Sequence, residues 1–254
     1  MVKVIAISNQ KGGVGKTTTA VNLAASMGIN GKKTLLIDMD PQGNTTSGVG
    51  YNKKNIKLSV YDLLIRDCKA EEVVIKTEFK NLDLIPSSMD LAAAELELID
   101  FESRESKLKN KINSIKEKYS YIIIDCPPSL GLITTNAVCS SDTILIPVQC
   151  EYYALEGLSQ LMNSTFKRMK KFNKRLELEG VLMTMYDGRL KLTEQAASEI
   201  KKFFPNKVFS TVIHRCVRLS EAPSFGKPIY YYDKSCKGTQ EYIDLSKEVI
   251  KNSR

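Results

Sequence analysis

The sequence has no tryptophan, a single histidine (His214) and six cysteines scattered along 254 residues. One histidine and no Cys-x-x-Cys pair leave no ligand spacing for a zinc or iron–sulfur site. The scattered cysteines indicate small buried side chains, not a disulfide framework. No apolar run approaches the roughly 18 residues that cross a bilayer. Because the first residues have the pattern of a strand and not of a secretory signal, we expect a cytoplasmic protein.

Acidic side chains are in the minority: 29 Asp and Glu against 37 Lys and Arg give a formal net charge of +8. Such an excess is typical of a protein with an anionic partner beyond a nucleotide. It is equally typical of a lysine-rich soluble protein, so the total alone does not distinguish the two. The apolar share of 43% and the charged share of 26% are those of an ordinary globular domain.

Short apolar, β-branched runs alternate with segments of helical periodicity along the chain. This alternation predicts an α/β fold, with a doubly wound, mostly parallel twisted sheet and helices on both faces. We expect strands at 2–8, 33–38, 82–86, 121–125, 143–148, 178–185 and 207–213. We expect helices at 16–28, 59–65, 89–99, 103–118, 130–139, 152–172, 191–203 and 237–251. With no linker or repeat, residues 1–254 are predicted to form a single domain with its site at the carboxyl ends of the strands.

The clearest motif is Lys11–Thr17, which reads KGGVGKT and follows the apolar run Val4–Ile7. A glycine-rich turn from a buried strand into a helix directs backbone N–H groups and the helix N-terminus at one point, as in a phosphate-binding P-loop. Gln10 stands where the usual pattern has its first glycine. The motif predicts a site for the phosphates of ATP.

Each part of the motif has an expected role. Lys16 is expected to contact the β- and γ-phosphates, and the Thr17 hydroxyl to bind Mg²⁺. Lys11 adds a second cation beside the phosphates, with a solvated loop lysine as the alternative. The other residues expected to line the nucleotide are Gly12, Gly13, Val14, Gly15 and Thr18.

Carboxylates end two further predicted strands. Asp38 and Asp40 follow one apolar run, and Asp125 follows Tyr121–Ile124. Because parallel strands share one carboxyl edge, these acids are expected beside the P-loop, although each acid alone could be a turn or cap residue. Asp125 suits the metal shell, and Asp38 and Asp40 could hold the waters of Mg²⁺ and the attacking water. The last two roles could be exchanged, since both side chains lie on one side of an extended segment.

These motifs resemble those of the ParA/Soj-type DNA-partition ATPases, of the deviant Walker A family that also includes MinD. Pro147–Leu158 (PVQCEYYALEGL) and Arg218–Pro223 (RLSEAP) extend the resemblance over nearly the whole chain. It implies that Lys11 reaches across a homodimer to the partner subunit's nucleotide. It also implies a slow Mg²⁺-dependent ATPase, in which hydrolysis to ADP and phosphate releases the dimer and Asp40 serves water activation.

The resemblance places His214 and Cys216 in the nucleotide-base pocket, where the family usually has Pro and Asn. A cysteine lacks the paired donor and acceptor with which an amide reads an adenine edge. Backbone contacts are therefore the expected substitute for reading adenine.

Basic residues concentrate in the C-terminal half. The resemblance assigns contacts with nonspecific double-stranded DNA to Arg189 and Arg218, and a dimer would align two such patches along phosphates without reading bases. The run 167–175 alone is more typical of a solvated helix end. We further expect a ParB-like partner that stimulates hydrolysis, and a nucleoid-associated protein.

Two other functions share these motifs. A MinD-like switch on a membrane surface needs an amphipathic C-terminal helix with bulky apolar residues, whereas residues 241–254 include acids and no Trp or Phe, so no membrane partner is expected. A small-molecule ATP-dependent ligase, such as a dethiobiotin-synthetase-like enzyme, shares only the P-loop. The sequence therefore favours an ATP-dependent dimerising switch that segregates chromosome or plasmid DNA.

Overall fold

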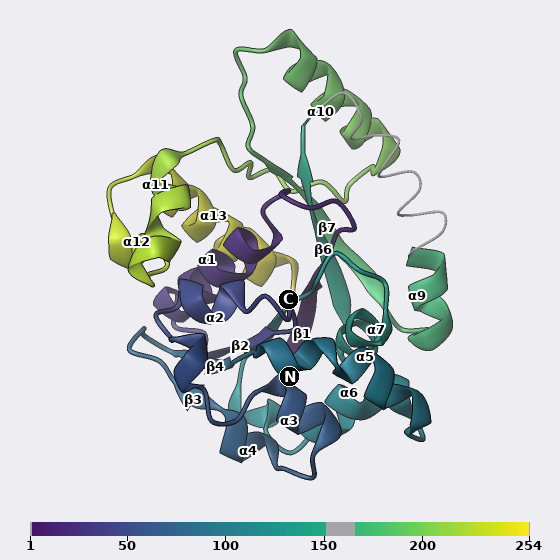
Figure 1. Ribbon diagram of the computed structural model, residues 1–254. Coiled ribbons are helices and arrows are strands. Elements are labelled where there is room, and N and C mark those ends of the chain that lie inside the picture. Colours follow the sequence, from purple (N-terminus) through teal and green to yellow (C-terminus); the bar gives the residue numbers. More distant parts are fainter. Residues whose placement is uncertain (1, 151–165, 254) are drawn as a thin grey trace.

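The computed structural model describes residues 2–150 and 166–253, and within them the chain forms a seven-stranded sheet (Figure 1). The strand order is β3-β4-β2-β5-β1-β6-β7, and every pair is parallel except β3 with β4. The strands are β1 (Lys3–Ile7), β2 (Thr34–Asp38), β3 (Ile75–Lys76), β4 (Leu82–Ile85), β5 (Tyr121–Asp125), β6 (Thr143–Gln149) and β7 (Glu177–Thr184). The predicted fold class is confirmed.

Helices cover both faces of this sheet (Figure 1). The longer ones are α1 (Lys16–Ile29), α7 (Leu132–Ser140), α10 (Lys191–Phe203) and α13 (Lys237–Asn252). The shorter ones are α2 (Asn44–Gly48), α3 (Val60–Ile65), α4 (Ala70–Val73), α5 (Ala94–Glu97), α6 (Lys107–Ile112), α9 (Lys167–Phe172), α11 (Val217–Glu221) and α12 (Ile229–Tyr232). No helix of the described part of the chain is both long and apolar enough to span a membrane.

The core divides into layers because successive strand residues point to opposite faces. Ile5 and Ile7 of β1 belong to the cluster that packs against α1 and α13. Val4 and Ala6 belong to the cluster on the other face, under α3, α6 and α7. Strands buried on both faces must be apolar at nearly every position, which explains the continuous runs in the sequence.

The register of the central strands sets the place of the site. Asp125 of β5 is paired in register with Ile7 of β1 on one side and with Asp38 of β2 on the other. The P-loop leaves β1 at this same carboxyl edge, so the two acids lie on neighbouring strands below it.

The predicted strand at 207–213 is wrong. Within this segment Val208 makes an isolated bridge to Val181 of β7, and the next bridge, between His214 and Tyr186, lies just beyond the ends of both segments. The backbone N–H groups of Ser210 and Thr211 donate to the carboxylate of Glu248 on α13, at 2.7 and 3.0 Å. Because a side chain from another element takes these two donors, the strand ladder is interrupted.

Two predicted helices are shorter than expected. The helix predicted at 103–118 corresponds to α6 with a 3₁₀ turn on either side. Ser103 has a left-handed φ of +52°, which a helix does not allow, so the helical turns begin after it. The prediction at 89–99 is realised as α5 between two 3₁₀ turns. Of the helix predicted at 152–172, only the end is described, as α9. The rest of it, and most of the Pro147–Leu158 motif, lie outside the described residues.

Candidate nucleotide-binding site

The loop between β1 and α1 has the backbone of a phosphate cradle. Gly13 and Gly15 adopt φ values of +73° and +87°, which a side chain would strain. A Cβ atom added to Gly12 or Gly13 would meet no atom of residues 2–150 and 166–253 within 4 Å, so these residues leave space in front of the loop. Gly15 is the N-cap of α1, and its left-handed conformation turns the chain from the loop into the helix. An anion at this point would face the first N–H groups of α1.

The Lys16 side chain is held by a backbone carbonyl group of its own loop. It is only 8% exposed, and its Nζ donates to the carbonyl oxygen of Lys11 at 3.1 Å. Burial lowers the pKa of Lys16, while the charges of Asp125 and Asp40 oppose that shift. Lys11 itself is exposed, and its backbone N–H donates to Asn9 Oδ1 at 3.0 Å. The two lysines therefore occupy different environments, Lys16 enclosed and Lys11 exposed.

Asp125 lies directly under the helix start. Its Oδ2 accepts from the hydroxyls of Thr17 at 2.8 Å and Thr45 at 2.7 Å. Its Oδ1 is buried and has no hydrogen-bond partner within residues 2–150 and 166–253. A buried carboxylate oxygen without a donor is costly and calls for an explanation, such as an ion. Burial also raises the pKa of Asp125 to about 6.

Asp38 and Asp40 differ in their surroundings. The Oδ2 of Asp38 accepts from the backbone N–H and the hydroxyl of Thr46, at 2.8 and 2.7 Å, and its Oδ1 accepts from Asp40 N–H at 3.1 Å. Burial, and then the neighbouring Asp125, raise the pKa of Asp38 to about 7. Asp40 is half-buried, and its Oδ1 accepts from Gln42 N–H. The geometry thus gives Asp38 an anchoring position and leaves Asp40 nearer to solvent.

These residues fit Mg²⁺ and a triphosphate. The Thr17 hydroxyl and the unpartnered oxygen of Asp125 are hard oxygen donors, which Mg²⁺ prefers. The Gly12–Gly13 backbone leaves open space where the phosphates would lie. Divalent charge beside Asp38 and Asp125 would favour their ionised forms, against the effect of burial.

Sequence reasoning missed Thr45 and Thr46, although they bond directly to the two buried acids. Gly43, at a left-handed φ of +62°, begins α2 and turns both threonines toward the ends of β2 and β5. Their signal is adjacency, because they come only a few residues after Asp38 and Asp40 in the sequence. That signal could be recognised only after the strand order placed β2 beside β5.

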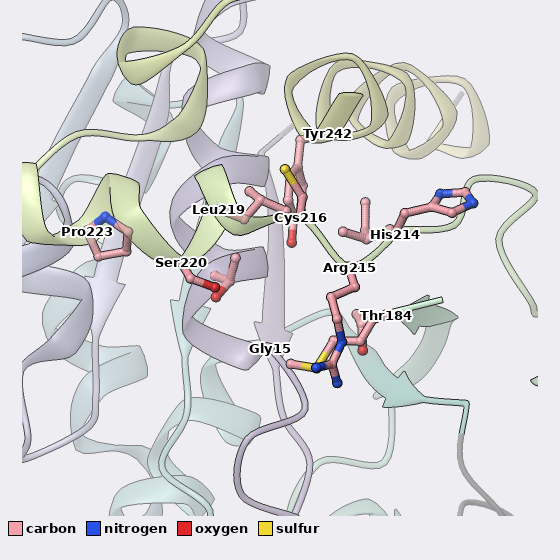
Figure 2. Close-up of a pocket in the computed structure, with 12 residues that line it drawn as sticks. Gly15, Thr184, His214, Arg215, Cys216, Leu219, Ser220, Pro223 and Tyr242 are labelled. Atoms are coloured by element: carbon pink, nitrogen blue, oxygen red, sulfur yellow. The ribbon is translucent and has the colours of Figure 1, made fainter. Parts of the chain in front are cut away.

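A pocket of about 420 Å³ adjoins the P-loop and is lined in part by Gly15, Thr18, His214 and Cys216 (Figure 2). The carboxylate of Glu241 accepts from the backbone N–H of His214 at 3.0 Å and lies 2.6 Å from its Nδ1. Figure 2 shows this imidazole turned away from Cys216. Both predicted residues therefore line the pocket, and the imidazole of His214 is held by Glu241.

The two arginines expected to contact DNA lie on different elements, and both are exposed. Arg189, before α10, donates to Asp187 through Nε at 2.8 Å and Nη2 at 2.6 Å. Arg218, on α11, donates through Nη1 to Glu221 at 2.9 Å. Any phosphate that binds either arginine must compete with these carboxylates.

Comparison with known proteins agrees with this geometry. A family model described as an AAA domain matches residues 2–178. The sporulation initiation inhibitor protein Soj of Bacillus subtilis is 55% identical over 99% of this chain and 100% of its own length. The chain belongs to the ParA/Soj family of chromosome-partitioning ATPases. The chromosome partitioning protein ParA of Myxococcus xanthus is 48% identical, over 98% of this chain and 88% of that protein.

Among solved structures, the cobyrinic acid a,c-diamide synthase of Mycobacterium smegmatis with bound ADP and magnesium has a TM-score of 0.86. It is 29% identical and covers 100% of this chain and 96% of its own. The P-loop ATPase fold of the ParA/Soj family is therefore shared by partition proteins and by a small-molecule synthase. The site, not the fold, must carry the functional argument.

Proposed function

We propose that this ParA/Soj-family protein is an ATP-dependent dimerising switch, formed by one domain over residues 1–254, that segregates chromosome or plasmid DNA. The observation that carries the proposal is that Lys16 lies at the same edge of the sheet as the Thr17–Asp125 pair, with its Nζ bonded to the backbone carbonyl oxygen of Lys11. A second lysine, Lys11, is thereby part of the same loop. A cradle for one triphosphate needs only Lys16 as its cation. The exposed Lys11 supplies charge toward a second subunit.

The roles follow from the local chemistry. Lys16 and the loop N–H groups bind the β- and γ-phosphates, and Thr17 with Asp125 and Asp38 holds Mg²⁺, which would neutralise phosphate charge. Asp40, the acid nearer to solvent, orients the attacking water. Lys11 stabilises γ-phosphate charge in the partner subunit, in the manner of an arginine finger. Hydrolysis removes that shared charge, and the dimer separates.

The pocket beside Gly15 would hold the base, with Cys216 and backbone groups as its contacts. Arg189 and Arg218 of both subunits would bind phosphates of nonspecific double-stranded DNA. The protein would therefore associate with the nucleoid. A ParB-like partner would stimulate hydrolysis. The identities of 55% and 48% to partition proteins, against 29% to a small-molecule synthase, favour this function over a ligase.

The test compares DNA binding with ATP, with ADP and with the Lys16→Ala variant. We expect DNA binding only by the unchanged chain with ATP. Binding should also weaken steeply as salt rises, because the slope of log K against log salt is about −0.9 for each phosphate contacted. Equal binding in all three conditions would contradict the switch. ATPase rates alone, with DNA, and with DNA plus a ParB-like protein test the partner.

A further inference from the structure

The segment that follows β4 carries apolar side chains on both faces. On its inner side, Leu91, Ala94 and Leu98 are completely buried. They belong to the core cluster that contains residues of α3 and α7. A helical segment that needed only to cover the core would carry polar residues on its outer face.

The outer face of this segment is apolar as well. Met89, Leu96 and Ile99 are 63%, 73% and 50% exposed. Ala92 and Ala93 lie between them and are also exposed. We call these five residues the apolar stripe. Single exposed apolar residues are ordinary, but a stripe at helical spacing indicates a contact surface.

The charge around the stripe indicates what binds there. Residues 89–103 contain five acidic side chains and no lysine or arginine, in a chain whose net charge is +8. Two basic residues lie at one end of the segment: Arg104 donates to the carbonyl oxygen of Ile99 at 2.7 Å, and Lys107 lies over the ring of Phe101. The acids outnumber them. Asp90, Asp100 and Glu102 are exposed at its edges. These carboxylates repel DNA phosphates and anionic lipid. A protein surface rich in lysine and arginine is complementary to them, and the remainder of this chain has that character.

Glu95 connects the segment that carries the stripe to the start of α7, near the candidate nucleotide site. Its carboxylate accepts from the N–H groups of Leu132 at 2.8 Å and Ile133 at 3.2 Å, the first two residues of α7. The loop that leads into α7 comes directly from Asp125. A Cβ atom on Gly131 would overlap the Glu95 carboxylate, so the glycine permits this contact. A shift of the loop after Asp125 therefore moves Glu95 and the stripe with it.

We propose that the apolar stripe is a contact surface for a second copy of this chain, and that Glu95 is the positioning residue that sets it according to the bound nucleotide. The inference rests on the proposed dimerising switch. It adds an apolar surface to a dimer otherwise held by phosphate charge. The stripe and the P-loop both adjoin the carboxyl edge of the sheet, so one face of the second copy, the face that presents its own Lys11, can reach both.

The test is sedimentation velocity of the full chain with Mg²⁺ and a non-hydrolysable ATP analogue. Leu96→Glu is expected to raise the dimer dissociation constant at least about tenfold, because burying a new carboxylate in a contact is costly. Its affinity for ADP, which lacks the γ-phosphate shared with the second subunit, should not change. Leu192→Glu, on α10 and 47% exposed, is the matched control and should dimerise as the unchanged chain does.

The outcomes separate the two proposals. An unchanged chain that stays monomeric with the analogue overturns the switch and the stripe together. A Leu96→Glu variant that dimerises as tightly as the unchanged chain overturns the stripe alone. For Glu95, alanine should weaken the dimer without weakening ADP binding, and Glu95→Gln, which keeps one acceptor oxygen, should restore part of the dimerisation. If Glu95→Ala dimerises as tightly as the unchanged chain, Glu95 does not couple the stripe to the bound nucleotide.

Discussion

Replacing Thr45 by valine would test how the protein keeps Asp125 ionised. The Thr45 hydroxyl donates one of the two hydrogen bonds to Asp125 Oδ2, at 2.7 Å, and valine has nearly the same shape without that donor. Burial raises the pKa of Asp125 to about 6, and the bonds from Thr45 and Thr17 act against that rise. At neutral pH the unchanged carboxyl is therefore mostly ionised and able to bind Mg²⁺.

The expected size of the effect follows from this one bond. A hydrogen bond to a charged group contributes about 1.5–3 kcal/mol, and one pKa unit corresponds to about 1.4 kcal/mol. Its loss should raise the pKa of Asp125 by about one to two units. Because a proton on Asp125 competes with Mg²⁺, affinity for Mg²⁺ and ATP is present at high pH and is lost as pH falls through this pKa. In Thr45→Val that loss should begin at a higher pH.

The assay is Mg²⁺-dependent binding of a fluorescent ATP analogue between pH 6 and 9. We expect the acid limb of Thr45→Val to move up by about one to two pH units, with little change at the alkaline end. Thr34→Val is the control, because that buried hydroxyl donates to the Lys32 carbonyl oxygen instead. The same acid limb in Thr45→Val and the unchanged chain would refute the reasoning.

Three other predictions follow from the same geometry. Lys11→Ala should keep nucleotide binding and lose ATP-dependent dimerisation and hydrolysis, whereas Lys16→Ala should lose the nucleotide itself; calorimetry and sedimentation distinguish them. Asp187→Asn should strengthen DNA binding, since it frees the guanidinium of Arg189, while Arg189→Ala should weaken it and reduce the salt slope by about 0.9 per subunit. Weaker DNA binding by Asp187→Asn would mean that the carboxylate orients the arginine and does not compete with DNA. Cys216→Asn should raise the preference for ATP over GTP about tenfold, because an amide can read both edge groups of adenine; an unchanged ratio in competition binding would show that backbone groups decide it.

Much of the site could be predicted because its chemistry is local in sequence. A glycine-rich turn needs its glycines in succession, as the φ angles of Gly13 and Gly15 show. Asp125 follows a run that is apolar because β5 is buried on both faces. Such features need no knowledge of distant residues.

The failed strand prediction has a long-range cause. The strand predicted at 207–213 has suitable residues, but Glu248, far along the chain, takes two of its backbone donors. Glu241, on the same helix, contacts the imidazole of His214, which lines the pocket as predicted. Only the packing of α13 reveals these two contacts.

The sequence by itself determined the family, the phosphate cradle and the acids at the strand ends, because each is encoded in a few consecutive residues. Only the tertiary structure decided how those acids are held. The order β2-β5-β1 places Asp38 beside Asp125 and brings Thr45 within 2.7 Å of it. The structure also left an apolar stripe exposed and joined it through Glu95 to the start of α7. These relations depend on distances between segments, which a linear sequence does not contain.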